Sequence, residues 1–250
     1  MTAWALDLDG VVWLAEEPIA GSVDAVRTLL DRGERVVLVS NNSSVTIADY
    51  WEKLRRMGVP DGPDLVTSAM AAATLVAPSE RVLVCGGPGV SEAVIERGAE
   101  ALPNDVDHDR IDVVVVGFHR DFDYERLRRA AGAVRGGARL IATNDDATYP
   151  TPDGLIPGGG AILAAIERGS GVHATVAGKP YAPIVGLVRE RYGSTGTMVG
   201  DRPDTDGRFA RALGWRFALV LSGVTVSAAG ANPAPDVVAD DLAALVRTTS

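Results

Sequence analysis

The sequence predicts an α/β protein in which a central parallel sheet is flanked by helices. Apolar runs typical of buried strands alternate from end to end with segments of helical periodicity. Several of the helical segments, among them GSVDAVRTLLDRG (21–33), close at a glycine suited to end a helix. Because strand and helix alternate in this way, we expect parallel strands with helices on both faces of the sheet.

Eight apolar runs are the candidate strands. In chain order they are AWALDL (3–8), RVVLVS (35–40), RVLVC (81–85), DVVVVG (112–117), ARLIAT (138–143), ATVAG (174–178), TMVG (197–200) and RFALVLS (216–222). The segments between them, such as APIVGLVRERYG (182–193), have the spacing of helices. The sequence contains no repeat of fixed period and no low-complexity tract.

Composition and net charge indicate which classes of binding partner this chain can have. The chain has 250 residues, enough for one large domain or two medium ones, and its 46% hydrophobic and 23% charged residues are typical of a globular protein. A formal net charge of −9 argues against nucleic acid and against anionic membranes as partners. An anionic substrate must therefore be bound by local positive groups or by a metal ion.

The single cysteine, Cys85, cannot form an intrachain disulfide, which fits a reducing compartment, and we expect it to be a small buried apolar residue. The N-terminal segment does not resemble a signal peptide. Residues 217–235 carry no charge, but glycine, serine, asparagine and proline interrupt them, so they predict a strand and a loop instead of a membrane span. We therefore expect a soluble, cytoplasmic protein.

Polar groups follow four of the predicted strands. They are DLDG (7–10) at the first run, SNNSS (40–44) at the second, GKP (178–180) at the sixth and GDRPDTD (200–206) at the seventh. Ligands of parallel sheets bind beyond the carboxyl ends of the strands. We therefore expect carboxylates, a hydroxyl, amides and a lysine to meet at one edge of one sheet.

The third, fourth and fifth runs end in Gly-rich or featureless sequence, and they lie together between the second and the sixth. We interpret residues 79–175 as a separate α/β module. It is inserted into a core that both chain ends form, residues 1–78 and 176–250.

The first polar group holds two acids on alternate positions. Because strand side chains alternate, Asp7 and Asp9 are expected to point to the same side, and Gly10 allows the chain to turn sharply after them. Taken alone, such a pair is more often two solvated acids before a turn. The other three polar groups favour a chemical role.

A carboxylate that attacks a phosphate dianion meets a repulsion of about 10 kcal/mol at about 3 Å and an effective dielectric constant near 20. A divalent cation held by Asp7 and Asp201, together with the ammonium of Lys179, would offset this repulsion. Ligands that are all oxygens suit magnesium (Mg2+) and not zinc. The sequence therefore predicts a magnesium-assisted reaction at a phosphate ester.

Two further groups complete this prediction. Ser40 and Asn41 offer a hydroxyl and a backbone amide to the phosphoryl oxygens. Asp9 can protonate the departing oxygen and later deprotonate water, and crowding by neighbouring negative charge is expected to favour its protonated form.

Taken together, the four groups resemble the motifs of the haloacid dehalogenase (HAD) superfamily of phosphatases, in the same order and over almost the whole chain. The resemblance is to the branch that contains pyridoxal phosphatase, phosphoglycolate phosphatase and para-nitrophenyl phosphatase-like enzymes. It rests on DLDGVVW, VSNNSS, GKP, GDRPDTD, ATNDD, PGGG (157–160), SGVT and PDVVADDLAAL. It implies a Rossmann-like core, 1–78 and 176–250, and an inserted α/β cap, 79–175, that closes over the site.

The resemblance implies Asp7 as the nucleophile that forms a phosphoaspartate and Asp9 as the general acid and base. Magnesium would be bound by Asp7, the backbone carbonyl of Asp9, and Asp201. Asp206 would lie outside the direct ligands and orient a metal-bound water or the lysine. Asp204 either shares that task or caps a helix.

The resemblance also implies a phosphate site. Ser40, Asn41 and Asn42 would line it, and Lys179 would bridge phosphate and nucleophile. The cap loop NDDATYP (144–150) would reach the substrate, with Tyr149 at the position where pyridoxal phosphatase has a histidine. This difference argues against pyridoxal phosphate and suggests that Tyr149 contacts the organic part of another substrate.

We therefore expect a magnesium-dependent phosphatase that hydrolyses a small phosphorylated metabolite. Two alternatives stay open: a phosphotransferase or mutase on the same core, and a signalling module that is phosphorylated on aspartate. The substrate itself is not legible in the sequence, and neither monomer nor homodimer is favoured.

Overall fold

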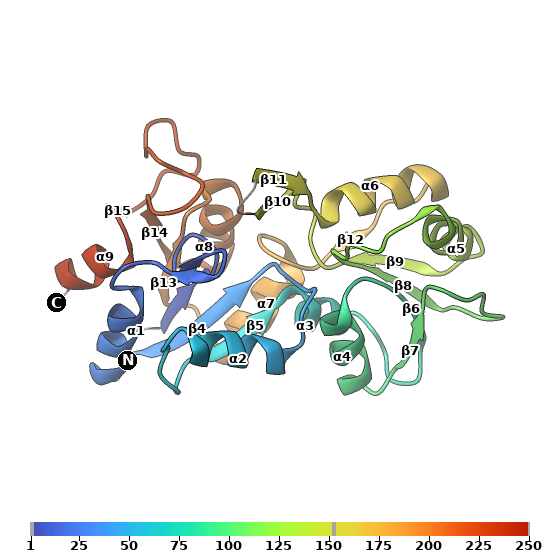
Figure 1. Cartoon of the computed structure of the whole chain (residues 1–250), viewed down its shortest axis with the longest axis horizontal. Helices are drawn as coiled ribbons and strands as arrows, with labels where there is room; N and C mark the ends of the chain where they lie inside the picture. Colours follow the sequence, from blue (N-terminus) through green and yellow to red (C-terminus); the bar gives the residue numbers. More distant parts are fainter. Residues whose placement is uncertain (1–2, 152–153, 250) are drawn as a thin grey trace. The chain divides into compact units, whose positions relative to one another are not determined.

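A computed structural model describes residues 3–151 and 154–249, and it has the predicted mixed α/β fold (Figure 1). The chain forms two compact units. The first unit contains the residues up to Ser40, Tyr50–Val66, and the residues from Lys179 onward; the second contains Asn41–Asp49 and Thr67–Gly178.

The second unit is larger than the predicted module, 79–175. It also includes residues 41–49, 67–78 and 176–178. Three interactions explain the difference: Val176 pairs with Ala142 within the second unit's sheet, helix α3 (Ser68–Ala73) packs against α4 (Pro88–Glu96), and Ser43 Oγ lies 2.9 Å from Thr143 Oγ1. The assignment of the two units as catalytic core and cap stays a prediction.

The first unit is built on a six-stranded sheet with the order β15-β14-β13-β1-β4-β5. Its strands are β1 (Ala3–Leu6), β4 (Arg35–Ser40), β5 (Asp64–Thr67), β13 (Gly196–Gly200), β14 (Arg216–Val220) and β15 (Val237–Ala239). β1 lies between β13 and β4 and is parallel to both, with Leu6 opposite Val199 and Leu38. Every residue of β1 and of β13 is buried, as expected for the centre of a sheet that is covered on both faces.

Each helix of this unit buries part of its surface. The helices are α1 (Ser22–Asp31), the C-terminal part of α2 (Ile47–Arg56), α7 (Ala182–Tyr192), α8 (Arg208–Leu213) and α9 (Leu242–Thr248). α1 packs against α9 and α7 packs against α8 (Figure 1). A short hairpin of β2 (Trp13–Leu14) and β3 (Glu17–Pro18) follows the first strand.

The second unit has its own parallel sheet, with the order β12-β9-β8-β6-β7. The strands are β6 (Arg81–Cys85), β7 (Glu100–Pro103), β8 (Val113–Val116), β9 (Arg139–Ala142) and β12 (Thr175–Val176). α5 (Tyr124–Arg135) packs against α6 (Gly159–Ser170), and β10 (Thr148–Thr151) and β11 (Gly154–Pro157) form an antiparallel hairpin.

The core of the second unit confirms the prediction for Cys85. The thiol is fully buried among side chains of the sheet and of α5 and α6, such as Leu83, Val114 and Ile166. Burial raises its pKa to about 12, so the group is a neutral thiol with little nucleophilic character.

Within the described residues, no helix combines the length and the apolar character that crossing a bilayer requires.

Candidate active site

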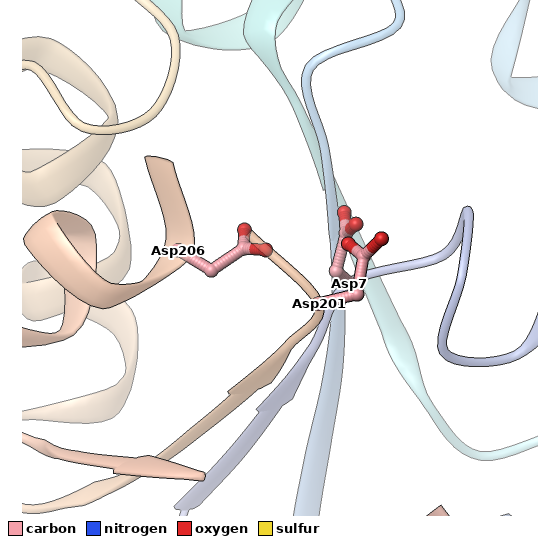
Figure 2. A group of neighbouring side chains, drawn as sticks. All are labelled: Asp7, Asp201 and Asp206. Atoms are coloured by element: carbon pink, nitrogen blue, oxygen red, sulfur yellow. The ribbon is translucent and has the colours of Figure 1, made fainter. Parts of the chain in front are cut away.

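Two carboxylates stand side by side at the carboxyl ends of adjacent strands. The amide of Asp7 donates to the carbonyl of Val199 (2.9 Å), which extends the pairing of β1 with β13 by one residue. Asp201 follows β13 directly. Because β1 and β13 are parallel neighbours, both side chains leave the same edge of the sheet, as Figure 2 shows.

A third carboxylate, that of Asp206, is directed toward them from a helical turn (Figure 2). Residues 203–207 form a single π-helical turn in which the carbonyl of Arg202 accepts from the amide of Asp206 (2.8 Å). The amide of Arg202 donates to Asp206 Oδ2 (3.2 Å) and fixes the side chain. One oxygen each of Asp7, Asp201 and Asp206 lies within 4.8 Å of the others.

The structure decides between the two acids of this turn. Asp204 is exposed and faces Arg202 Nη2 at 3.6 Å, whereas Asp206 is fully buried. Asp206 is therefore the acid that shares the site with Asp7 and Asp201.

Lys179 holds two of these carboxylates. Its Nζ donates to Asp7 Oδ1 (2.6 Å), to Asp206 Oδ1 (2.7 Å) and to the carbonyl of Val39 (3.2 Å), and the side chain is buried. Burial alone would lower the pKa of Lys179, but the charges of Asp206 and Asp7 raise it above its ordinary value. The ammonium is therefore charged throughout the neutral range.

The strand that precedes Lys179 belongs to a different sheet from the one predicted. The sixth apolar run was expected to be a strand of the same sheet as the first, but β12 pairs with β9 in the second unit. Three of the four polar groups therefore follow strands of one sheet, β1, β4 and β13, and the lysine follows a strand of the other. That prediction was wrong because two-residue strands take their sheet from distant pairing partners.

The charges of this cluster do not balance. Three carboxylates face one ammonium, and burial, more than any neighbouring charge, raises the pKa of all three. Burial and the charges of Asp7 and Asp206 raise the pKa of Asp201 to about 8. Burial also raises the pKa of Asp206, but only to about 6, because the charge of Lys179 lowers it. The cluster therefore favours an additional positive charge.

Asp201 Oδ1 is the atom best placed to bind such a positive charge. This atom is buried and has no hydrogen-bond partner among the described residues. A buried carboxylate oxygen without a donor is costly unless a cation binds it. The donors around it are carboxylate oxygens, which suit a hard divalent cation such as magnesium.

Two glycines let the backbone approach Asp201. Gly10 has φ +85°, as its predicted turn requires, and a Cβ there would lie 2.5 Å from Asp201 Oδ2. A Cβ at Gly223 would also collide with the Asp201 carboxylate, and the amide of Val224 donates to Asp201 Oδ2 at 2.5 Å. Gly223 and Val224 were not singled out from the sequence, although they belong to the SGVT stretch that carries part of the resemblance.

Asp9 has a different hydrogen-bond partner from the three clustered carboxylates. Its Oδ1 accepts from the indole Nε1 of Trp13 (2.9 Å). The pKa of Asp9 is raised, as predicted, and burial is the main cause; the hydrogen bond from Trp13 and the charges of Lys53 and Lys179 lower it. Negative charge, the predicted cause, contributes least, through Glu16.

The predicted phosphate-site residues are divided between the units. Ser40 ends β4 in the first unit, and its Oγ accepts from the hydroxyl of Tyr50 (3.0 Å), a residue that sequence reasoning missed. Asn41 and Asn42, which follow it directly, belong to the second unit. There Asn41 Nδ2 donates to Asp146 Oδ2 (3.1 Å), and Asn42 Oδ1 accepts from the amide of Ser44 (2.9 Å).

Tyr149 also belongs to the second unit. It lies in β10, and its ring stacks on that of Phe118 with centroids 4.9 Å apart and an angle of 6° between the planes. The structure thus brings Asp7, Lys179, Asp201 and Asp206 together within the first unit. For Asn41, Asn42 and Tyr149 a part in substrate binding stays a prediction.

Comparison with known families agrees with this arrangement. Residues 4–100 match the family described as haloacid dehalogenase-like hydrolase, and residues 176–245 match a second family described as HAD-hydrolase-like. An acid sugar phosphatase from Staphylococcus aureus is 36% identical over 230 residues, which cover 89% of this chain and 87% of the relative.

Solved structures are similar over nearly the whole chain. A p-nitrophenyl phosphatase from Archaeoglobus fulgidus has a TM-score of 0.89 and 31% identity, covering 99% of this chain and 98% of its own. A glycerol phosphate phosphatase from Mycobacterium tuberculosis, in complex with calcium, has a TM-score of 0.86 and 35% identity, covering 98% of this chain and 74% of its own. A magnesium complex of that enzyme also matches, with a TM-score of 0.86 and 34% identity over 98% of this chain and 76% of its own.

Metal-free protein should lose stability as the pH rises through the neutral range. The pKa of Asp201 is raised from 3.8 to about 8 in the folded chain, so between these values the folded chain keeps a proton that the unfolded chain has lost. The resulting stabilisation is complete below about pH 4 and is lost as the pH rises through about 8, by at most about 1.4 kcal/mol per pH unit. Thermal unfolding in EDTA across this range measures it.

Asp201→Asn is the matched control, since the amide keeps the shape of the side chain and does not titrate. Its melting temperature should vary less over the same range, and added Mg2+ should stabilise the wild type far more than this variant. A wild type whose melting temperature follows that of Asp201→Asn at every pH would contradict the prediction.

Gly10→Ala should cost more stability than its backbone conformation explains. Gly33 has φ +73° and no atom within 4 Å of an added Cβ, so Gly33→Ala measures the conformational cost alone, about 1–2 kcal/mol. Gly10→Ala adds a collision with Asp201, which should cost about 1–3 kcal/mol more. Urea denaturation compares the two variants, and equal costs would argue against close contact between Gly10 and Asp201.

Proposed function

This chain belongs to the haloacid dehalogenase-like hydrolase family, and we propose on that basis that it is a magnesium-dependent phosphatase that forms a phosphoaspartate at Asp7. Its enzyme class, hydrolase of phosphoric monoesters, is that of its relatives. The observation that supports the mechanism most strongly is the buried ammonium of Lys179, which donates to Asp7 and Asp206. Beside them, Asp201 Oδ1 has no hydrogen-bond partner within residues 3–151 and 154–249.

In the first step a carboxylate oxygen of Asp7 attacks the phosphorus of the ester. The bond between phosphorus and the ester oxygen breaks, and its electron pair stays on that oxygen, which takes a proton from Asp9. Lys179 holds Asp7 in place (2.6 Å), and its positive charge reduces the repulsion between carboxylate and phosphate. Burial raises the pKa of Asp9, which favours the protonated form that an acid needs.

In the second step Asp9 acts as a base. It takes a proton from a water molecule whose oxygen attacks the phosphorus, and the bond from phosphorus to Asp7 breaks. Inorganic phosphate leaves, Asp7 is again a carboxylate, and Asp9 is again protonated. Ser40, Asn41 and Asn42 are proposed to donate to the phosphoryl oxygens in both steps.

Magnesium would be held by Asp7, by Asp201 and by the main-chain carbonyl of Asp9. When bound, it would offset the negative charge of the phosphate and of the carboxylates around it. Asp206, whose Oδ1 is taken by Lys179 and whose Oδ2 accepts from Arg202, is better placed to orient the lysine than to bind the ion.

We propose a small polyol phosphate or sugar phosphate as the substrate. The support is the names of the relatives, an acid sugar phosphatase and a glycerol phosphate phosphatase. Tyr149 is proposed to contact the organic part of this substrate. Hydrolysis is favoured over transfer to a second metabolite because the relatives named above are phosphatases.

A reducing, cytoplasmic setting is the compartment we propose. Its support is Cys85, which is a free and buried thiol. Either a monomer or a homodimer is compatible with the proposed reaction, because the grouped side chains Asp7, Lys179, Asp201 and Asp206 all come from one unit of one chain.

Asp7→Asn should abolish turnover while the protein still folds. An amide cannot attack phosphorus, and loss of a nucleophile costs about 10⁴-fold or more in rate. Release of inorganic phosphate from glycerol 1-phosphate is the assay, and intact-mass analysis after acid quenching should detect a phosphorylated chain in the wild type only. Asp24→Asn, which changes an exposed acid of α1, is the control and should keep full activity. Substantial magnesium-dependent activity in Asp7→Asn would exclude Asp7 as the nucleophile.

Removal of the metal should stop the reaction, and Asp201 and Asp206 should respond differently when it is restored. EDTA should abolish activity and Mg2+ should recover it. Asp201→Asn should raise the Mg2+ concentration for half-maximal activity by at least about tenfold, since it removes a proposed ligand. Asp206→Asn should mainly lower kcat, because it frees Lys179 from its second partner. Full activity in EDTA, or equal Mg2+ requirements in the two variants, would contradict these assignments.

A further inference from the structure

Trp13 makes a contact that the proposed chemistry does not yet use. The side chain is 2% exposed, and its indole Nε1 donates to Asp9 Oδ1 at 2.9 Å. Asp9 is the residue proposed to carry the proton in both steps. A tryptophan in direct contact with it can determine where that proton is delivered.

The backbone brings Trp13 back to Asp9. The carbonyl of Leu8 accepts from the amides of Val12 (2.9 Å) and Trp13 (3.1 Å), and the amide of Gly10 donates to the carbonyl of Trp13 (2.8 Å). This closed loop forms a bridge between Asp9 and Trp13. Leu8 and Val12 are fully buried, so the loop is anchored in the core.

A cation holds the tryptophan ring from its face. Lys53 of α2 places its Nζ 4.4 Å from the ring centroid of Trp13. The same Nζ donates to the carbonyl of Ala15 (2.7 Å) and to Glu16 Oε1 (3.3 Å), and Arg56 binds Glu16 Oε2 (2.8 Å). A cation over an aromatic face is attracted to the ring, and here it also withdraws electron density from the indole, which strengthens the N–H as a donor.

The donor type determines which carboxyl oxygen of Asp9 can hold the proton. An indole N–H donates and cannot accept, so Oδ1 of Asp9 turns a lone pair toward Trp13. In a protonated carboxyl the carbonyl oxygen accepts hydrogen bonds better than the hydroxyl oxygen, so this contact favours Oδ1 as the carbonyl and Oδ2 as the oxygen with the proton.

We propose that Trp13, held by Lys53, is a positioning residue that directs Asp9 Oδ2 to the departing ester oxygen. This rests on the proposed function. As the bond from phosphorus to the ester oxygen breaks and its electron pair stays on that oxygen, the proton moves from Asp9 Oδ2 to it, and Asp9 is left as a carboxylate stabilised by the indole N–H.

The dependence of the rate on the leaving group separates positioning from folding. An alkyl ester such as glycerol 1-phosphate needs protonation of its leaving oxygen, whereas 4-nitrophenyl phosphate releases a stable phenolate without it. The value of kcat/KM covers the steps through transfer of phosphate to Asp7, which is the step that uses the acid. The ratio of kcat/KM for the two esters does not depend on how much of a preparation is folded.

Trp13→Phe removes the N–H and keeps an aromatic ring. It should lower kcat/KM for glycerol 1-phosphate by about tenfold or more, because general acid catalysis contributes to this step. The value of kcat/KM for 4-nitrophenyl phosphate should stay within about twofold of the wild-type value. Trp4→Phe is the matched control: Trp4 is also buried, and its Nε1 has no hydrogen-bond partner in the part of the chain that the structure describes. The ratio of kcat/KM for the two esters in Trp4→Phe should equal that of the wild type.

Lys53→Met keeps the stem of the side chain and removes the charge over the ring. It should shift the ratio in the same direction by about two- to threefold. If Trp13→Phe does not yield folded protein, an unchanged ratio in Lys53→Met overturns the proposal. Equal losses on both esters, an unchanged ratio in Trp13→Phe, or the same shift in Trp4→Phe would overturn the proposal.

Asp9→Asn separates the proposal that Asp9 is the general acid from the proposal that Trp13 positions it. It should lower kcat/KM for glycerol 1-phosphate by about 100-fold or more, which supports Asp9 as the acid. If it does and Trp13→Phe leaves the ratio unchanged, only the role of Trp13 is wrong. If Asp9→Asn has no effect on glycerol 1-phosphate, the proposed role of Asp9 fails and the role of Trp13 fails with it.

Discussion

The ammonium of Lys179 is the interaction on which the site depends. It donates to Asp7 and to Asp206 inside the protein, next to Asp201, so one positive charge faces three carboxylates. Burying charged groups is unfavourable unless they are paired, and here the pairing is incomplete. Such a cluster makes a weak contribution to stability, but it is suited to bind a cation and an anionic substrate.

The fold supplies the rigidity that this arrangement needs. Asp7 and Asp201 extend from two buried neighbouring strands, and Asp206 comes from a π-helical turn whose amides share the carbonyl of Arg202. Gly10 and Gly223 allow the backbone to pass close to the Asp201 carboxylate. Side chains on strand ends and fixed turns are held more accurately than side chains on long loops, which is what a reaction at one phosphorus atom requires.

Asp7 and Asp9 are two residues apart, yet their surroundings differ. Burial raises the pKa of Asp7 too, but the ammonium of Lys179 opposes that rise and favours the carboxylate that a nucleophile must be. Asp9 is buried beside an indole N–H, and burial favours its protonated form. Two carboxyl groups of one motif are thereby adapted to two roles, as in other enzymes that use a pair of acids.

The sequence was sufficient to predict the fold class, the family and the meeting of Asp7, Lys179 and Asp201, because these follow from local motifs at strand ends. It was insufficient where distant contacts decide. The sheet to which β12 belongs depends on its pairing with β9, and the extent of the second unit depends on the packing of α3. The contact of Trp13 with Asp9 depends on how the loop after β1 closes on itself. The DLDGVVW motif contains both residues but does not indicate this closure.

The central claim is that Asp7 and Asp201, beside Lys179, hold a divalent cation. The most direct test is a crystal structure of the protein grown with Mn2+, whose anomalous scattering locates the ion that replaces Mg2+. We predict an anomalous peak within about 2.2 Å of an oxygen of Asp7 and of Asp201 Oδ1. A site without such a peak at saturating Mn2+, with Asp201 Oδ1 bonded to a protein donor instead, would contradict the claim.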